Sequence, residues 1–120
     1  MKVGNAITTR KKNNGNIIVR IVGSEYMAKN VEEHKRICEE LNNLYERKNR
    51  DYGDSFHTSY LEEGMAMARI RLGDKLNRFK TLTKGEQQMV NDESIRDTLI
   101  DLANYAIMTV MEMDREAEEE

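Results

Sequence analysis

The sequence predicts a mainly α-helical protein: an antiparallel bundle of about four helices, completed by dimerisation and preceded by a β-hairpin. Three observations predict this class. Apolar residues recur at steps of three and four over long stretches, which is the period of one helix face. No proline interrupts the 120 residues, and 34% of them are charged with both signs, as expected for helices with long solvated faces. A chain of this length supports one small core, or a core that two chains complete together.

Residues 1–23 differ from the rest in pattern and in charge. Asn13-Asn14-Gly15-Asn16 is a turn signal, the β-branched run 17–22 follows it, and residues 6–9 can pair back against that run. The segment carries basic residues and no acidic one. We therefore predict a basic hairpin that acts as an adaptor to a partner protein, a dimer contact or a lid. The basic residues are Lys2, Arg10, Lys11, Lys12 and Arg20.

The remaining chain predicts the helices in order. Ser24 is a suitable N-cap for a helix over about 25–47, and 55–63 forms a short helix or an irregular piece. A third helix runs from 64 to about 82, and Asp92, Glu93 and Ser94 open a last helix that ends near 115. Three apolar faces are expected to form the core: Met27, Val31, His34, Cys38, Leu41 and Tyr45 in the first; Met65, Ala68, Leu72, Leu76 and Phe79 in the third; and Ile95, Leu99, Leu102, Ala106, Thr109 and Met113 in the last.

These elements divide the chain into a hairpin extension at 1–23, an all-α domain at 24–116 and an acidic tail at 117–120. A net charge of −3 argues against general nucleic-acid binding. No apolar run approaches the ~20 residues of a membrane span, and the start of the chain lacks the apolar region of a signal peptide. Cys38 is the one cysteine, so we expect no internal disulfide, a cytoplasmic protein and a buried, unreactive thiol.

The last helix carries the strongest indication of a functional site. Glu93, Asp97, Asp101 and Asn104 fall on one stripe at about 100° per residue. Such a stripe is usually a solvated face, but here the helix is apolar almost all round from 103 to 113, so the stripe continues into a covered surface. Two aspartates one turn apart repel each other when they are covered, and a divalent cation removes that cost. We therefore favour a metal site over a solvated face.

Two other segments supply candidate partners for this stripe. In the third helix, Asp74 shares a face with Asn77 and Arg78, either as an ordinary Asp74–Arg78 pair or as a third carboxylate for the metal. Basic residues suited to phosphate are Lys48, Arg69, Lys75 and Arg78. Before the short helix, Asn49 and Tyr52 suit contact with a base or sugar, although Gly53 beside them is explained equally well as a helix cap.

From residue 48 to residue 113 the sequence resembles the first of the nucleotide modification associated domain families, small proteins common in phages and prophages. That family in turn resembles a branch of the all-α nucleoside triphosphate pyrophosphatases, which include MazG and the dimeric dUTPases. The resemblance rests on three motifs: Lys48-Asn49-x-Asp51-Tyr52-Gly53-Asp54-Ser55-Phe56, Arg69-Ile70-x-Leu72-x-Asp74-Lys75-Leu76-Asn77-Arg78, and Asp92-Glu93-Ser94-Ile95-x-Asp97-Thr98-Leu99-x-Asp101-Leu102-Ala103-Asn104-Tyr105-Ala106.

This resemblance implies a helical homodimer or homotetramer that uses Mg²⁺, or Mn²⁺, to split nucleoside triphosphates into monophosphate and pyrophosphate. For a phage-encoded member the compartment would be the host cytoplasm. The pyrophosphatases carry a Glu-Glu-x-x-Glu helix followed by a Glu-x-x-Asp helix. Here Asp74 and Asn77 stand where the first motif has glutamates, and Asp97 with Asp101 approximates the second at a spacing of four.

The sequence therefore predicts a Mg²⁺-dependent pyrophosphohydrolase acting on nucleoside triphosphates, with deoxyribonucleotides or modified deoxyribonucleotides preferred. Glu93, Asp97 and Asp101 are the expected catalytic residues, with Asp74 joining them as metal ligands and Glu93 as an additional ligand or as the base for water. A non-catalytic nucleotide-binding or phage–host interaction protein is the alternative, and a purely structural bundle is a third. The expected substrate-binding residues are Lys48, Asn49, Tyr52, Arg69, Lys75, Asn77, Arg78 and Asn104.

Overall fold

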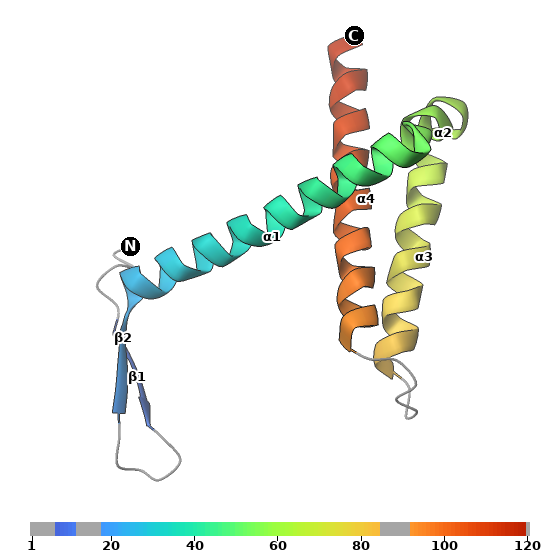
Figure 1. Cartoon of the computed structure of the whole chain (residues 1–120). Helices are drawn as coiled ribbons and strands as arrows, with labels where there is room; N and C mark the ends of the chain where they lie inside the picture. The colour runs from blue at the N-terminus through green and yellow to red at the C-terminus, as the bar shows by residue number, and fades with distance from the viewer. Residues whose placement is uncertain (1–6, 12–17, 85–91, 120) are drawn as a thin grey trace. The chain divides into compact units, whose positions relative to one another are not determined.

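The computed structural model describes the backbone of residues 7–11, 18–84 and 92–119, and the side chains of residues 23–84 and 94–119. The predicted helical class and the four predicted helices are confirmed, with a strand pair before them (Figure 1). The chain divides into two compact units, residues 1–40 and 41–120, and this division falls inside the first helix. The elements are β1 (Ile7–Lys11), β2 (Ile18–Val22), α1 (Gly23–Tyr52), α2 (Ser55–Glu63), α3 (Met65–Lys84) and α4 (Asp92–Glu119).

The first unit contains the strand pair and the N-terminal part of α1. β1 and β2 pair antiparallel, with Ile7 opposite Val22 and Lys11 opposite Ile18, in agreement with the predicted pairing. The turn expected at 13–16 and the loop expected at 86–91 lie outside the described residues. α1 continues to Tyr52, five residues beyond the predicted end, and α4 continues to Glu119, so residues 117–119 are helical and not a separate tail.

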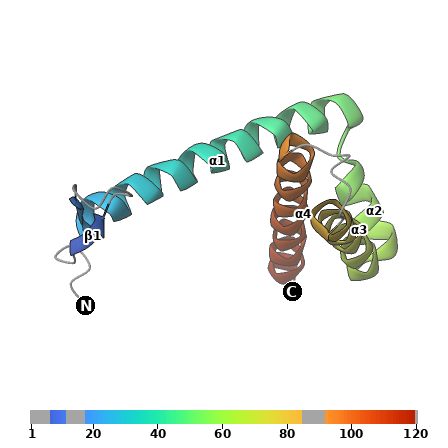
Figure 2. The same cartoon turned by 90° about the horizontal axis from the view of Figure 1, so that it is seen from below.

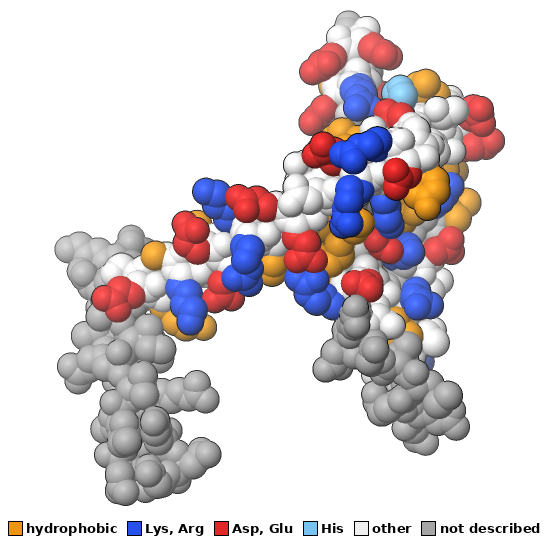
Figure 3. All heavy atoms as spheres, viewed as in Figure 1, with side chains coloured by type: hydrophobic (Ala, Val, Ile, Leu, Met, Phe, Trp, Pro, Cys, Tyr) orange, Lys and Arg blue, Asp and Glu red, His pale blue; other side chains and the backbone are white. Residues whose placement is uncertain are grey.

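The apolar face of α1 in the first unit is exposed, which corrects one expectation. Met27 and Val31 are exposed, Val31 at 60%, and Cys38 is exposed as well, with its Sγ 3.6 Å from Nδ1 of His34. The predicted buried thiol was wrong because helical spacing identifies an apolar face without identifying what covers it. Acidic and basic side chains are interspersed along the visible face of this helix (Figure 3).

In the second unit, α3 and α4 lie side by side and antiparallel (Figures 1 and 2), and α2 packs against both. The core is small: Tyr60, Met67 and Ala68 are buried, with Phe56 packed against them. Gly53 ends α1 with a φ of +67°, in the left-handed region where a glycine costs least. The helix-cap reading of Gly53 is therefore correct. None of the described helices is long and apolar enough to cross a membrane.

Only part of the predicted apolar stripe of α4 packs within the chain. Asp101, Tyr105 and Met108 are half-buried and Glu112 is buried, and we call these four residues the inner face. We define the outer face as Leu99, Ala106, Val110 and Met113, all exposed. Three of those four belong to the expected core stripe, whereas its other members, Ile95, Leu102 and Thr109, are half-buried or buried, so that expectation is correct for half of the stripe and wrong for the rest. The physical reason is that α4 is apolar on both sides, and one chain can cover only one of them.

Candidate functional site

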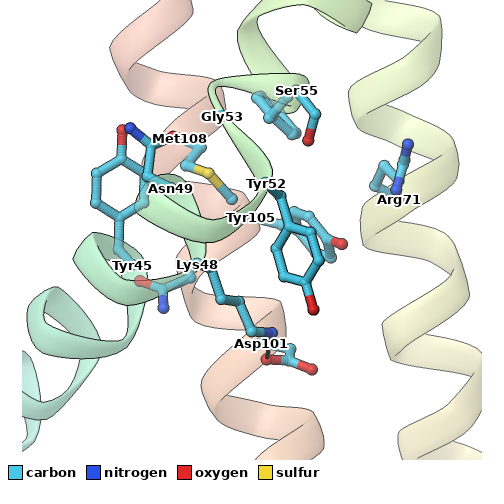
Figure 4. Close-up of a pocket in the computed structure, with 12 residues that line it drawn as sticks. Tyr45, Lys48, Asn49, Tyr52, Gly53, Ser55, Arg71, Asp101, Tyr105 and Met108 are labelled. Carbon is cyan, nitrogen blue, oxygen red and sulfur yellow. Dashed lines mark hydrogen bonds and ion pairs between the residues drawn. The ribbon is translucent and has the colours of Figure 1, made fainter.

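A cavity of about 310 Å³ lies in the second unit, where the end of α1 and the start of α2 meet α4, with one residue from α3 at its edge (Figure 4). The walls combine aromatic rings, two amides, two cations and one carboxylate. Its lining residues are Tyr45, Lys48, Asn49, Tyr52, Gly53, Ser55, Phe56, Arg71, Asp101, Asn104, Tyr105 and Met108.

Helical spacing brings these side chains to the same place. On α1, Lys48 and Asn49 follow Tyr45 by three and four residues and precede Tyr52 by four and three, so the four share a face. The α4 lining residues are spaced in the same way. Asn104 joins the two helices directly, because its Nδ2 donates a hydrogen bond to the backbone oxygen of Leu41 over 3.2 Å. The cavity is therefore built by two helix faces that are fixed against each other.

Asp101 is the electrostatic centre of the site. Its Oδ1 lies 3.4 Å from Nζ of Lys48 on α1, and its Oδ2 lies 3.1 Å from Nζ of Lys75 on α3. The Asp101 side chain is 24% exposed, against 55% for Lys48 and 28% for Lys75. One half-buried carboxylate thus holds two ammonium groups from two different helices, and Figure 4 shows Lys48 reaching Asp101 beside Tyr52.

Aromatic side chains form the other wall. The Phe56 ring stacks on Tyr105 with ring centroids 5.9 Å apart and on Tyr60 at 6.5 Å. Phe56 therefore links the cavity wall to the buried core. Tyr52 is 74% exposed and lies at the edge of the cavity, where its ring is free to cover a flat ligand. Rings of this kind stack on nucleobases and sugars irrespective of the exact base.

The structure brings together part of the predicted site. Lys48, Asn49, Tyr52, Asp101 and Asn104 line the cavity, and Lys75 reaches it through Asp101. The other predicted side chains are exposed and do not line the cavity, while the side chain of Glu93 lies outside the described residues. The exposed residues are Arg69, Asp74, Asn77, Arg78 and Asp97.

The positions of the carboxylates show whether they could form the expected metal site. Among the side chains that the structure describes, no group of three or more His, Cys, Asp or Glu residues is placed to hold a metal ion. Asp97 and Asp101 are one turn apart on α4, and Mg²⁺ commonly takes one or two carboxylates together with water and substrate phosphates. The described side chains therefore do not form a closed protein cage for a metal ion.

Sequence reasoning missed several lining residues: Tyr45, Phe56, Arg71, Tyr105 and Met108. Tyr45 belongs to the predicted core face of the first helix, and the sequence pattern gives Arg71 no role. A local signal was present for two of them, because Tyr45 precedes Lys48 by three residues and Tyr105 follows Asp101 by four. No local signal marks Phe56 or Arg71, since their places depend on how α2 and α3 pack.

A second polar cluster holds α2 against α4. Its α2 member, His57, directly follows the cavity residues Ser55 and Phe56. Glu112 is buried, and its carboxylate lies 2.7 Å from Nδ1 of His57 and 2.6 Å from Nη1 of Arg115. Beside it, a hydrogen bond to Glu116 raises the pKa of Tyr60, with burial and the charge of Glu112 adding to the effect. These contacts dock the helix that supplies Ser55 and Phe56 to the cavity.

Comparison with known proteins identifies the family. No curated protein and no solved structure matches the chain. The model of one protein family matches residues 48–113, which span more than half of the chain and include the cavity residues Lys48, Asp101 and Met108. The chain belongs to the nucleotide modification associated domain 1 family.

Proposed function

We propose that the protein binds a nucleoside triphosphate in the cavity of the second unit and hydrolyses it to monophosphate and pyrophosphate with Mg²⁺. The observation that carries the proposal is the cavity itself, which combines aromatic rings, amides and a pair of lysines around one carboxylate. Those groups match the three parts of a nucleotide. The family, named for nucleotide modification, supports the same ligand class.

Each part of the nucleotide has candidate partners. Tyr52 and Tyr105 offer ring faces for the base, and Asn49 with Asn104 offers amide donors and acceptors for its edge or for the sugar. The phosphates would lie toward Lys48, Lys75 and Arg71, where Arg71 can donate two hydrogen bonds to one phosphate. A deoxyribonucleotide, including one with a modified base, is the proposed substrate.

The proposed chemistry uses Asp101, which lines the cavity, and two carboxylates that precede it on α4. Asp101 and Asp97 would hold Mg²⁺, which supplies charge neutralisation and polarises the phosphoryl oxygens. Glu93 opens α4 two turns before Asp101 and is the proposed base for the attacking water. The lysines offset negative charge that develops on the leaving pyrophosphate.

A substrate panel tests the proposal. Purified protein with Mg²⁺ is given ribo- and deoxyribonucleoside triphosphates, including base-modified ones, and pyrophosphate release is measured. Turnover of at least one nucleotide is expected, and Tyr52→Ala and Lys48→Gln should each reduce kcat/KM by about tenfold or more. Tyr26→Ala and Lys29→Gln are matched controls, because these α1 residues are exposed and do not line the cavity. No turnover with any nucleotide contradicts the hydrolase.

The second candidate is a nucleotide-binding protein that does not catalyse hydrolysis. It is favoured by the state of Asp101, whose two oxygens are each occupied by a lysine, and by the lack of a three-carboxylate group among the described side chains. Calorimetry that shows tight nucleotide binding, together with an inactive substrate panel, selects this function. The basic segment 1–23 would then be the proposed contact to a partner protein.

We further propose that the protein forms a homodimer or a homotetramer. The outer face of α4 supports this, since Val110 is 54% exposed and Met113 50% exposed on the same helix as the packed inner face. Contiguous exposed apolar residues of this kind mark interaction sites more often than solvated surface. A second copy that covers the outer face would complete the core that one chain leaves open.

A further inference from the structure

We propose that Asp101 is an internal placeholder for phosphate: in the ligand-free protein its carboxylate occupies the site between Lys48 and Lys75 that a phosphate group of the ligand takes on binding. This inference rests on the proposed nucleotide function and concerns the regulation of the same cavity. It assigns the two lysines a role in binding the ligand. Asp101 pairs with the lysines before the ligand binds and with a cation afterwards.

The geometry around Asp101 is that of an anion site. Lys48 comes from α1 and Lys75 from α3, and both approach a residue of α4 from separate helices. Two ammonium groups that converge on one point repel each other, so they require an anion between them. In the described structure the anion is the Asp101 carboxylate, which uses one oxygen for each lysine. A phosphate group has the additional oxygens and charge to replace it.

The Lys48–Asp101 contact is weak enough to be exchanged, whereas the Lys75–Asp101 contact is shorter, at 3.1 Å, and less exposed. The Lys48–Asp101 distance of 3.4 Å is long for a charged hydrogen bond, and more than half of the Lys48 side chain is exposed. Ion pairs with this exposure contribute little net free energy. A lysine also carries its charge on a flexible stem, so that the ammonium can follow an incoming phosphate without movement of the helix. The exchange therefore needs no rearrangement of the fold.

The exchange has a consequence for divalent cations. While both lysines hold Asp101, a cation beside it meets two positive charges, so Mg²⁺ alone should bind poorly. Once the lysines move to the phosphates, the Asp101 carboxylate is free to bind a cation that accompanies them. Nucleotide and Mg²⁺ must then strengthen each other's binding by the same factor, because coupling between two sites is reciprocal.

Calorimetry without metal tests the placeholder directly. Inorganic triphosphate is titrated into wild-type protein and into Asp101→Asn in the presence of a chelator. Removing the competing charge should tighten triphosphate binding by about three- to tenfold, whereas Lys75→Gln should weaken it. Asp114→Asn is the matched control, since this aspartate is also on α4, is exposed and does not line the cavity, so its loss should change little. Equal or weaker binding by Asp101→Asn overturns the inference.

Two further arms separate this inference from the proposed function. With Mg²⁺ present, wild-type protein should gain affinity for triphosphate and Asp101→Asn should gain less; an equal gain also overturns the inference. Repeating the titration with deoxyribonucleoside triphosphates tests the cavity as a nucleotide site. If these bind no better than triphosphate, the nucleotide function fails while the phosphate exchange stands. If they bind tightly through Tyr52 but Asp101→Asn does not tighten metal-free binding, the exchange fails and the function stands.

Discussion

The inner and outer faces of α4 present two unlike surfaces on one helix. The inner face meets the rest of the second unit and contains the carboxylates Asp101 and Glu112, each paired with two basic side chains. The outer face is apolar and exposed, with Val110 and Met113 about half accessible. In an isolated globular domain the two would be exchanged, with the apolar side packed and the charged side in water.

The difference shows that the polar residues of the inner face are packed because each has a partner within the chain. Covered carboxylates are costly unless they are paired, and here each is paired across helices. Buried Thr98 and Thr109 avoid a similar cost because each hydroxyl donates to a backbone oxygen one turn earlier, Ser94 and Tyr105 respectively. The paired carboxylates of the inner face therefore fit the proposed site, and the exposed outer face is the surface proposed for a second copy.

A matched pair of methionines should give the largest effect. Met108 is half-buried on the inner face and Met113 is exposed on the outer face. Met108→Ala should lower the free energy of unfolding by about 2 kcal/mol, whereas Met113→Ala should lower it by less than about 0.5 kcal/mol. Urea denaturation in dilute solution, where the protein is monomeric, provides both values. Equal losses would mean that the two faces are packed alike.

A charge on the outer face should give a smaller, concentration-dependent effect. Val110→Glu adds a carboxylate to the apolar surface that a second copy is proposed to cover, so the dimer dissociation constant should rise by about tenfold, or about 1.4 kcal/mol. Sedimentation velocity over a dilution series measures the constant. The far-ultraviolet circular dichroism of the monomer should not change, because Val110 is exposed in the single chain. A protein that is monomeric at every concentration would refute this role of the outer face.

The smallest effect concerns alkaline pH. The Tyr60 hydroxyl is hydrogen-bonded to Glu116, which raises its pKa in the folded protein. A raised folded pKa stabilises the fold below the ordinary tyrosine value of about 10, and this contribution is lost as the pH rises through the folded value. The thermal midpoint of wild-type protein should therefore lie above that of Tyr60→Phe at neutral pH and should fall by more than that of the variant between about pH 9 and about pH 12. Parallel pH profiles would exclude the contribution.

The sequence predicted the helices and part of the site because both depend on local spacing. The positions of Lys48, Asn49 and Tyr52 near the end of α1 and of Asp101 and Asn104 on α4 follow from helical phase, and all five line the cavity. The continuation of the Asp101 stripe into Met108 also indicated that this side of α4 would be covered. That interpretation agrees with the half-buried Asp101 and Met108.

What the sequence could not predict depends on packing between elements. Asp74 has helical phase suitable for a polar cluster, yet it is exposed, and Lys75 beside it is the residue that reaches Asp101. If α3 turned about its own axis by about 100°, the angle between successive residues, Asp74 would face α4 in place of Lys75. The periodicity of the sequence does not determine how far α3 is turned. The expected burial of Met27 and Val31 was wrong for a related reason. These apolar residues recur at helical spacing, but no described side chain covers them.

The pairing of His57 with Glu112 ties the short helix α2 to α4, and this bears on the order in which the cavity forms during folding. α2 contains nine residues, fewer than an isolated helix needs to be stable in water. Its structure must therefore appear only when it docks, whereas α3 and α4 can pair beforehand as a local hairpin of long helices. Ser55 and Phe56 would therefore become ordered late in folding. The backbone amides of α2 should exchange with solvent together, and faster than those of α3 and α4.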